Sequence, residues 1–137
     1  VTGLVEALLA AVPTTRWMRD ATRGGLGTVA NELAQTAGCA VVFDELALPI
    51  KPAVNGACEM LGIDPLYVAN EGRFLAVVPA EEADAAVAAM RATPGGEGAA
   101  VIGAIQSEPA GVVALRSPFG GSRIVDMLVG DPLPRIC

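Results

Sequence analysis

The stretch "RDATRGGLG" contains residue types that bind phosphate or carboxylate groups, namely Asp20, Thr22, Arg23, Gly24 and Gly25. It lies between a β-favouring run and the start of an amphipathic helix. Paired glycines let the backbone approach a ligand closely, the first N–H groups of a helix are free to bind an anion, and Arg23 can pair with a phosphate. The stretch also fits a plain helix start that Asp20 or Thr22 caps. On spacing alone both interpretations stay open.

A second motif, "ANEGRFL", places Glu71 directly before a run, 73–79, that we expect to be a fully buried strand. Burial raises the pKa of an unpaired carboxylate, which suits it to act as a general base. The alternative is a turn in which Asn70 and Gly72 supply special backbone angles and Glu71 is solvated.

The third motif is the C-terminal segment 130–137, "GDPLPRIC", which ends on a thiol. Its prolines disfavour a helix or a central strand and favour an extended arm, in which the last seven residues span about 23 Å. We predict that Cys137 is a carrier thiol at the tip of this arm. Pro134, Arg135 and Ile136 would position it through stiffness, charge and apolar contact. The alternative is a frayed end with an incidental cysteine.

Composition limits the possible functions. The 137 residues carry a net charge of −6, and the nine Lys and Arg are scattered singly, which argues against nucleic-acid binding. No apolar run approaches the roughly 20 residues that a membrane-spanning helix needs, and no signal peptide is visible. Cys39, Cys58 and Cys137 have no metal-binding spacing and no histidine accompanies them, so we predict no metal site. Isolated thiols are typical of the reducing cytoplasm, with Cys39 and Cys58 as buried structural residues.

Hydrophobic periodicity predicts an α+β domain with a mixed or antiparallel sheet covered by helices. We assign 1–129 to this domain and 130–137 to the tail. The predicted helices cover residues 4–12, 26–38, 53–62 and 81–92. The predicted strands cover residues 14–19, 40–45, 73–79, 99–106, 111–117 and 122–128.

Together the stretches "RDATRGG", "LPIKPAV", "ANEG", "GSRIVDML" and above all the terminal "PLPRIC" resemble the C-terminal half of the HypE family of hydrogenase maturation proteins. That family is related to aminoimidazole ribonucleotide synthetase and selenophosphate synthetase. The resemblance implies the C-terminal α+β domain of those synthetases. It also implies an ATP-dependent protein of two domains that forms a homodimer mainly through the N-terminal one.

The same resemblance implies a reaction on Cys137. In the family, the terminal cysteine receives a carbamoyl group from HypF, ATP-dependent dehydration converts it to a thiocyanate, and the cyano group passes to iron on the HypC–HypD complex for [NiFe] hydrogenase. Glu71 is then the candidate base, and Asp20, Arg23 and the Gly24–Gly25 loop are candidates to face the phosphates.

The chain starts at Val1 inside a helical pattern, and we interpret it as a fragment. The N-terminal domain that binds most of the ATP and Mg²⁺ in these synthetases is then absent, so we expect a carrier and docking domain without turnover. Two alternatives remain: an interaction module that does no chemistry, and another synthetase half that acts on a small substrate.

Overall fold

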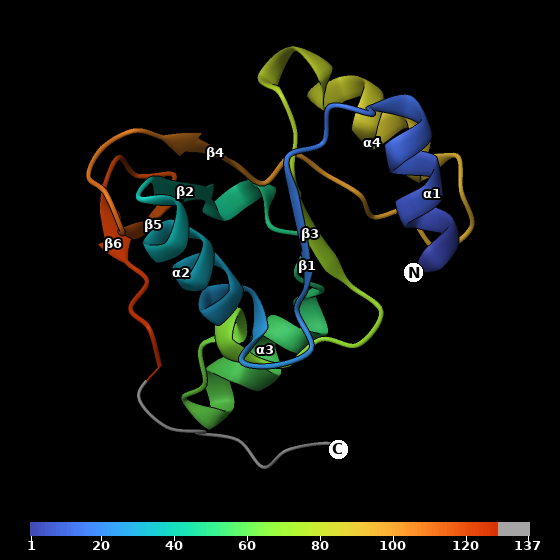
Figure 1. Cartoon of the computed structure of the whole chain (residues 1–137). Coiled ribbons are helices and arrows are strands. Elements are labelled where there is room, and N and C mark those ends of the chain that lie inside the picture. Colours follow the sequence, from blue (N-terminus) through green and yellow to red (C-terminus); the bar gives the residue numbers. More distant parts are fainter. Residues whose placement is uncertain (129–137) are drawn as a thin grey trace.

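The structure, a computed structural model, describes residues 1–128. Its elements follow the predicted order of alternating helices and strands, and then a run of strands (Figure 1). The helices are α1 (Thr2–Ala11), α2 (Gly25–Ala37), α3 (Pro52–Leu61) and α4 (Ala83–Arg91). The strands are β1 (Trp17–Asp20), β2 (Ala40–Asp44), β3 (Phe74–Val77), β4 (Gly103–Gln106), β5 (Val113–Arg116) and β6 (Ser122–Ile124). Short 3₁₀ turns, among them η2 (Pro65–Tyr67), connect them.

Four strands form a mixed sheet in the order β4-β2-β5-β6. The central pair β2 and β5 is parallel, and the two outer pairs are antiparallel. Helix α2 lies across this sheet, as Figure 1 shows. The core between them is aliphatic apart from Phe43, and consists of Ala30, Leu33, Ala34, Val41, Phe43, Leu66, Val113, Leu115 and Val125. The predicted α+β class is confirmed.

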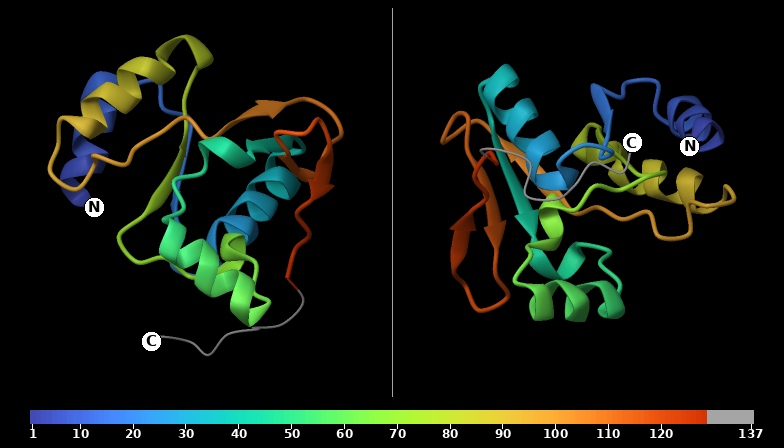
Figure 2. Two further views of the ribbon diagram at one scale, coloured as in Figure 1. Left: turned by 180° about the vertical axis from the view of Figure 1, so that it is seen from behind. Right: turned by 90° about the horizontal axis from the view of Figure 1, so that it is seen from below.

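The other two strands, β1 and β3, form a separate antiparallel pair that joins two cores. Trp17 lies opposite Val77 and Met18 opposite Ala76, and successive side chains of a strand point to opposite faces. Met18 and Ala76 therefore pack against a cluster around Leu8, where α1 and α4 lie side by side (Figure 2). Trp17 and Val77 pack against the core under α2. This pair of strands holds the α1–α4 layer to the rest of the domain.

Two helices end where the sequence predicts. Gly38 and Gly62 take the left-handed conformation that closes α2 and α3, with φ of +63° and +66°. The strands are shorter than predicted, and β3 is half-buried along its whole length. The prediction of a fully buried strand over 73–79 was wrong, because within residues 1–128 β3 pairs with β1 alone and stays half-buried.

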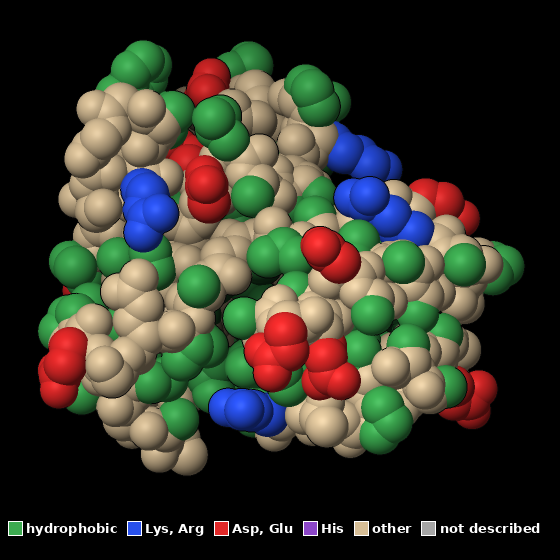
Figure 3. Space-filling model, turned by 90° about the horizontal axis from the view of Figure 1, so that it is seen from above, with side chains coloured by type: hydrophobic (Ala, Val, Ile, Leu, Met, Phe, Trp, Pro, Cys, Tyr) green, Lys and Arg blue, Asp and Glu red, His purple; other side chains and the backbone are tan. Residues whose placement is uncertain are grey.

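Charges are dispersed over the surface. Figure 3, a view from above, shows Lys and Arg side chains in ones and twos among acidic and apolar side chains. This face has no continuous basic patch of the kind that binds nucleic acid. Within residues 1–128, no helix is both long and apolar enough to cross a bilayer. Cys58 is buried as predicted, whereas Cys39 is only half-buried.

Candidate functional site

A small cleft lies where β1 ends and α2 begins. Its volume is about 160 Å³. The end of β1 and the following loop contribute Arg19, Asp20, Arg23 and Gly24 to its lining; α2 contributes Thr28, Val29 and Glu32, and Leu128 closes it. The structure therefore brings three of the predicted phosphate-facing residues together in one hollow.

Two consecutive glycines set the shape of the loop at this cleft. Gly24 and Gly25 have φ of +65° and +63°, a region that other residues rarely adopt. A side chain at Gly25 would also collide with the structure, because its Cβ would lie 2.5 Å from the carbonyl oxygen of Leu66. Gly25 is thus buried against the η2 turn, and Gly24 is the glycine that faces the cleft.

The start of α2 has no side-chain cap. Its N-cap residue is Gly24, and within residues 1–128 no side chain accepts a hydrogen bond from the first turn as a cap. The interpretation in which Asp20 or Thr22 caps the helix was therefore wrong. The first N–H groups of a helix have no partner inside it, and they carry the positive end of the helix dipole. At this end of α2, Gly24 and Thr28 line the cleft, whereas Gly25, Leu26 and Gly27 do not.

The charged side chains at the cleft divide into a paired and a separate group. Arg19 and Glu32 form an ion pair of 3.0 Å with side chains 55% and 40% exposed, so the pair adds at most about 1 kcal/mol to stability. Arg23 takes part in no ion pair among residues 1–128. Its guanidinium is the charge that remains available to an anion in the cleft.

Glu71 lies in a turn packed against the back of this loop. The amide of Asn70 donates a hydrogen bond to the carbonyl of Ala21 (3.0 Å), and the amide of Ala21 donates to the carbonyl of Arg73 (3.1 Å). The two sequence motifs are therefore neighbours. Glu71 itself is exposed and is not among the residues that line the cleft. The argument that burial would tune this carboxylate was wrong, because the strand that follows it is half-buried.

The expected turn around Glu71 is confirmed at Gly72, whereas Asn70 contributes a hydrogen bond and not a special backbone angle, since within residues 1–128 only glycines have a positive φ. Gly72 has a φ of +72°, and the side-chain amide of Asn70 donates to the carbonyl of Val68 at 2.9 Å. This geometry fixes the backbone on both sides of Glu71, whose proposed role as a base is a separate matter.

The remaining predicted site residues divide into two groups. Thr22 is half-buried in the loop but does not line the cleft. The predictions for the tail concern Pro134, Arg135, Ile136 and Cys137, which lie outside the described residues.

Sequence reasoning missed several residues of the cleft. Thr28 and Glu32 follow Gly24 at intervals of four, which places all three on one face of α2. That spacing was a usable signal. Leu128 had no such signal, because only the tertiary structure brings it to α2. Within residues 1–128, no three His, Cys, Asp or Glu side chains are grouped so as to hold a metal ion.

Comparison with known proteins identifies the domain. The model of the family described as "AIR synthase related protein, C-terminal domain" matches residues 4–116. The chain belongs to this family. The resemblance to the C-terminal part of HypE proteins is confirmed by a relative from Rhodobacter capsulatus, a "Carbamoyl dehydratase HypE", which is 59% identical over 134 residues.

This alignment covers 98% of the chain and 39% of the relative. The chain therefore spans about two fifths of the length of the relative that it matches.

Solved structures share the fold closely. A crystal structure of the hydrogenase maturation protein HypE in complex with ATP superposes with a TM-score of 0.90 and 41% identity, over 98% of this chain and 41% of that one. A HypE–HypF complex matches with a TM-score of 0.85 and 36% identity, over 90% of this chain and 40% of that one.

Proposed function

We propose that this chain is the C-terminal part of an ATP-dependent carbamoyl dehydratase of hydrogenase maturation, with Cys137 as the covalent carrier. The 59% identity to a carbamoyl dehydratase across nearly the whole chain is the observation that carries the proposal. The free thiols of Cys39 and Cys58 and the isolated position of Cys137 favour the cytoplasm as its compartment.

The proposed reaction converts an S-carbamoyl group on Cys137 into a thiocyanate. ATP, when bound, supplies the phosphoryl group that turns the amide oxygen into a leaving group. The carbon–oxygen bond then breaks, the oxygen departs within inorganic phosphate, and the nitrogen loses its two protons as the C≡N bond forms. The cyano group is afterwards transferred to iron of [NiFe] hydrogenase on the HypC–HypD complex.

The residues at the cleft can serve the charged parts of this reaction. The uncapped start of α2 and the Arg23 guanidinium favour anionic oxygens at Gly24. Asp20 lines the same hollow and is positioned to orient the groups that Arg23 holds. Glu71, on the turn hydrogen-bonded to this loop, is the proposed base that accepts a proton from the amide nitrogen.

Most of the nucleotide site lies in the part of the protein outside this chain, according to this proposal. The cleft of about 160 Å³ is smaller than the roughly 300–1,000 Å³ of small-molecule sites. It is large enough to hold a phosphate end rather than a whole nucleotide. We therefore propose that ATP and Mg²⁺ are held mainly by the additional domain, that the homodimer forms through it, and that residues 1–137 alone do not turn over.

The partners of the proposed function are the carbamoyl donor HypF and the acceptor complex HypC–HypD. The solved HypE–HypF complex, whose HypE chain shares the fold, supports the first of them.

The test of the proposal is to replace Cys137 by Ala in the full-length protein. We expect hydrogenase maturation to be lost while the thermal midpoint of unfolding is unchanged, because a side chain at the last position contributes little packing. Cys39→Ala is the matched control and is expected to keep the activity. Maturation that continues with Cys137→Ala would exclude a carrier role.

A further inference from the structure

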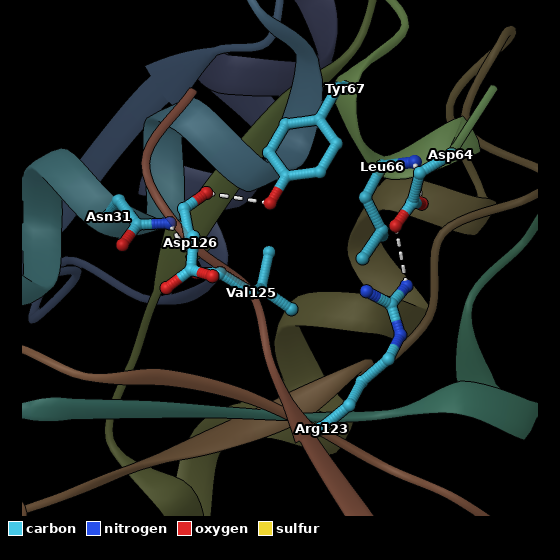
Figure 4. A network of polar contacts seen from close by, with 7 residues as sticks. All are labelled: Asn31, Asp64, Leu66, Tyr67, Arg123, Val125 and Asp126. Carbon is cyan, nitrogen blue, oxygen red and sulfur yellow. Dashed lines mark hydrogen bonds and ion pairs between the residues drawn. The ribbon is translucent and has the colours of Figure 1, made fainter. Parts of the chain in front are cut away.

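The last described segment, residues 123–128, is fastened by side chains from two other elements (Figure 4). We call this segment the tail root. The Tyr67 hydroxyl donates a hydrogen bond to the carbonyl of Asp126 at 2.6 Å. The side-chain amide of Asn31 donates to the carbonyl of Val125 at 2.8 Å. Arg123 forms an ion pair of 2.7 Å with Asp64, next to the η2 turn. These contacts hold the root at its start and in its middle, at Arg123, Val125 and Asp126.

Asn31 is unusual because it is polar and buried. Its exposure is 4%, and it is the one buried polar side chain within residues 1–128. Burying an amide costs free energy unless hydrogen bonds satisfy it. Here the amide nitrogen donates both to Gly27 within α2 and to Val125 after the end of β6. An apolar residue would suffice to fill the core beside Val125, so the amide serves to join the root to α2.

Tyr67 is held in place by a close contact with the same helix. A Cβ at Gly27 would lie 2.6 Å from the ring atom Cε1 of Tyr67, so only glycine lets the ring lie flat on α2. Burial, and next the nearby Asp64 carboxylate, raise the pKa of Tyr67, and the hydroxyl therefore stays protonated as a donor at neutral pH.

Helix α2 thus contacts the root and the cleft with different sides. Thr28 and Glu32 line the cleft, whereas Gly27 and Asn31 contact Tyr67 and the root. Leu128, at the end of the root, reaches the cleft. The end of the root therefore lies at the lining of the proposed reaction site.

We propose that Asn31, Tyr67 and Arg123 are positioning residues that fix the tail root, so that the segment carrying the C-terminal thiol starts beside the cleft. The proposal rests on the proposed carrier function of Cys137, and none of the three residues needs to touch the reacting atoms.

Chain statistics show what the root contributes. Cys137 is nine positions after Leu128, a reach of about 30 Å when extended. If the root detaches back to Ile124, Cys137 is thirteen positions after the last attached residue instead of nine, and the effective concentration of the thiol at the cleft falls about twofold by length alone. A detached root also no longer sets the direction of the chain at the cleft, which lowers the effective concentration of the thiol further.

The experiment measures the proximity of the thiol to the cleft without using the dehydration reaction. In the full-length protein, Thr28→Cys places a second thiol in the cleft lining. Under a fixed glutathione redox buffer, peptide mass mapping gives the rate at which the disulfide between positions 28 and 137 forms. The test background adds Tyr67→Phe and Arg123→Gln, which remove the hydroxyl and the ion pair at exposed sites. We expect disulfide formation to slow two- to tenfold.

Two controls separate positioning from general destabilisation. Arg91→Met removes a comparable bond, in which the Arg91 Nε donates to the carbonyl of Ala99, far from the root. Val12→Ala lowers stability from within the distant α1–α4 cluster. Both are expected to leave the rate unchanged.

An unchanged rate in the Tyr67→Phe and Arg123→Gln background would overturn the proposal. An equal slowing in the Val12→Ala control would overturn it as well. Since the readout is proximity, a full rate difference in a protein that fails to make thiocyanate would leave the positioning role intact and reject the proposed dehydration.

Discussion

Helix α2, with 13 residues, and helix α4, with 9 residues, differ at their ends. Helix α4 has Asp84 in its first turn and Arg91 in its last, and both charges complement the helix dipole. Helix α2 has no acidic residue in its first turn, no basic residue in its last, and a left-handed glycine in place of a side-chain cap. The charges at the ends of α4 stabilise that helix, whereas the start of α2 lacks such charges, which agrees with the proposal that it faces an anionic ligand.

The largest expected effect is on the dehydration rate, and it should distinguish Glu71, near the start of α2, from Glu81, near the start of α4. Glu71→Gln in the full-length protein should still accept the carbamoyl group on Cys137 but lose about 10²–10⁴-fold in dehydration rate, because the amide cannot accept the proton. The mass of the C-terminal peptide over time gives both rates. Glu81→Gln, at the exposed start of the α4 region, is the matched control and should change neither. Dehydration at the parental rate in Glu71→Gln would show that Glu71 is part of the turn and is not the base.

The next effect should appear in stability alone. Leu8 is fully buried between α1 and α4, and Leu8→Ala should lower the free energy of unfolding by about 2–5 kcal/mol through lost burial and a cavity. Chemical denaturation measures this loss. At a temperature where the variant is still folded, dehydration per folded molecule should equal that of the parent. A large decrease in that rate would show that the α1–α4 layer takes part in the reaction.

The smallest effect concerns pH. Because the fold raises the pKa of Tyr67 above its ordinary value of 10.0, its contribution to stability is complete below pH 10 and is lost as pH rises through the folded pKa. Tyr67 is the only tyrosine of the chain, so its tyrosinate absorbance gives this pKa directly. The thermal midpoint should fall in the same alkaline range and should fall less in Tyr67→Phe. A tyrosinate transition at or below pH 10 would contradict the assignment.

The order of elements could be predicted from sequence because local signals set it. Gly38 and Gly62 mark two helix ends, and β-favouring runs between turn residues locate the strands. Which strands pair could not be predicted, because such a run indicates a strand but not which strand lies alongside. The pairing of β1 with β3 starts the strand later than the predicted 14–19, at Trp17, and extends it to Asp20, and β3 is half-buried.

The site was predictable to a similar degree. Asp20, Arg23 and Gly24 share a cleft as their common motif suggests. The fold brings Glu71 to the same loop through two backbone hydrogen bonds, which no local pattern encodes. The joining of α2 to the tail root by Asn31 depends on a contact across 94 positions, and a lone asparagine in a helix gives no indication of it.

The central claim is that a carbamoyl group on Cys137 is dehydrated while attached to this chain. The most direct measurement is the mass of the C-terminal peptide after the full-length protein is carbamoylated and then given ATP and Mg²⁺. The account predicts a species on Cys137 that is lighter than the carbamoylated peptide by one water and that does not form without ATP. A carbamoyl adduct that persists with ATP, or an adduct on Cys39 or Cys58 instead, would contradict it.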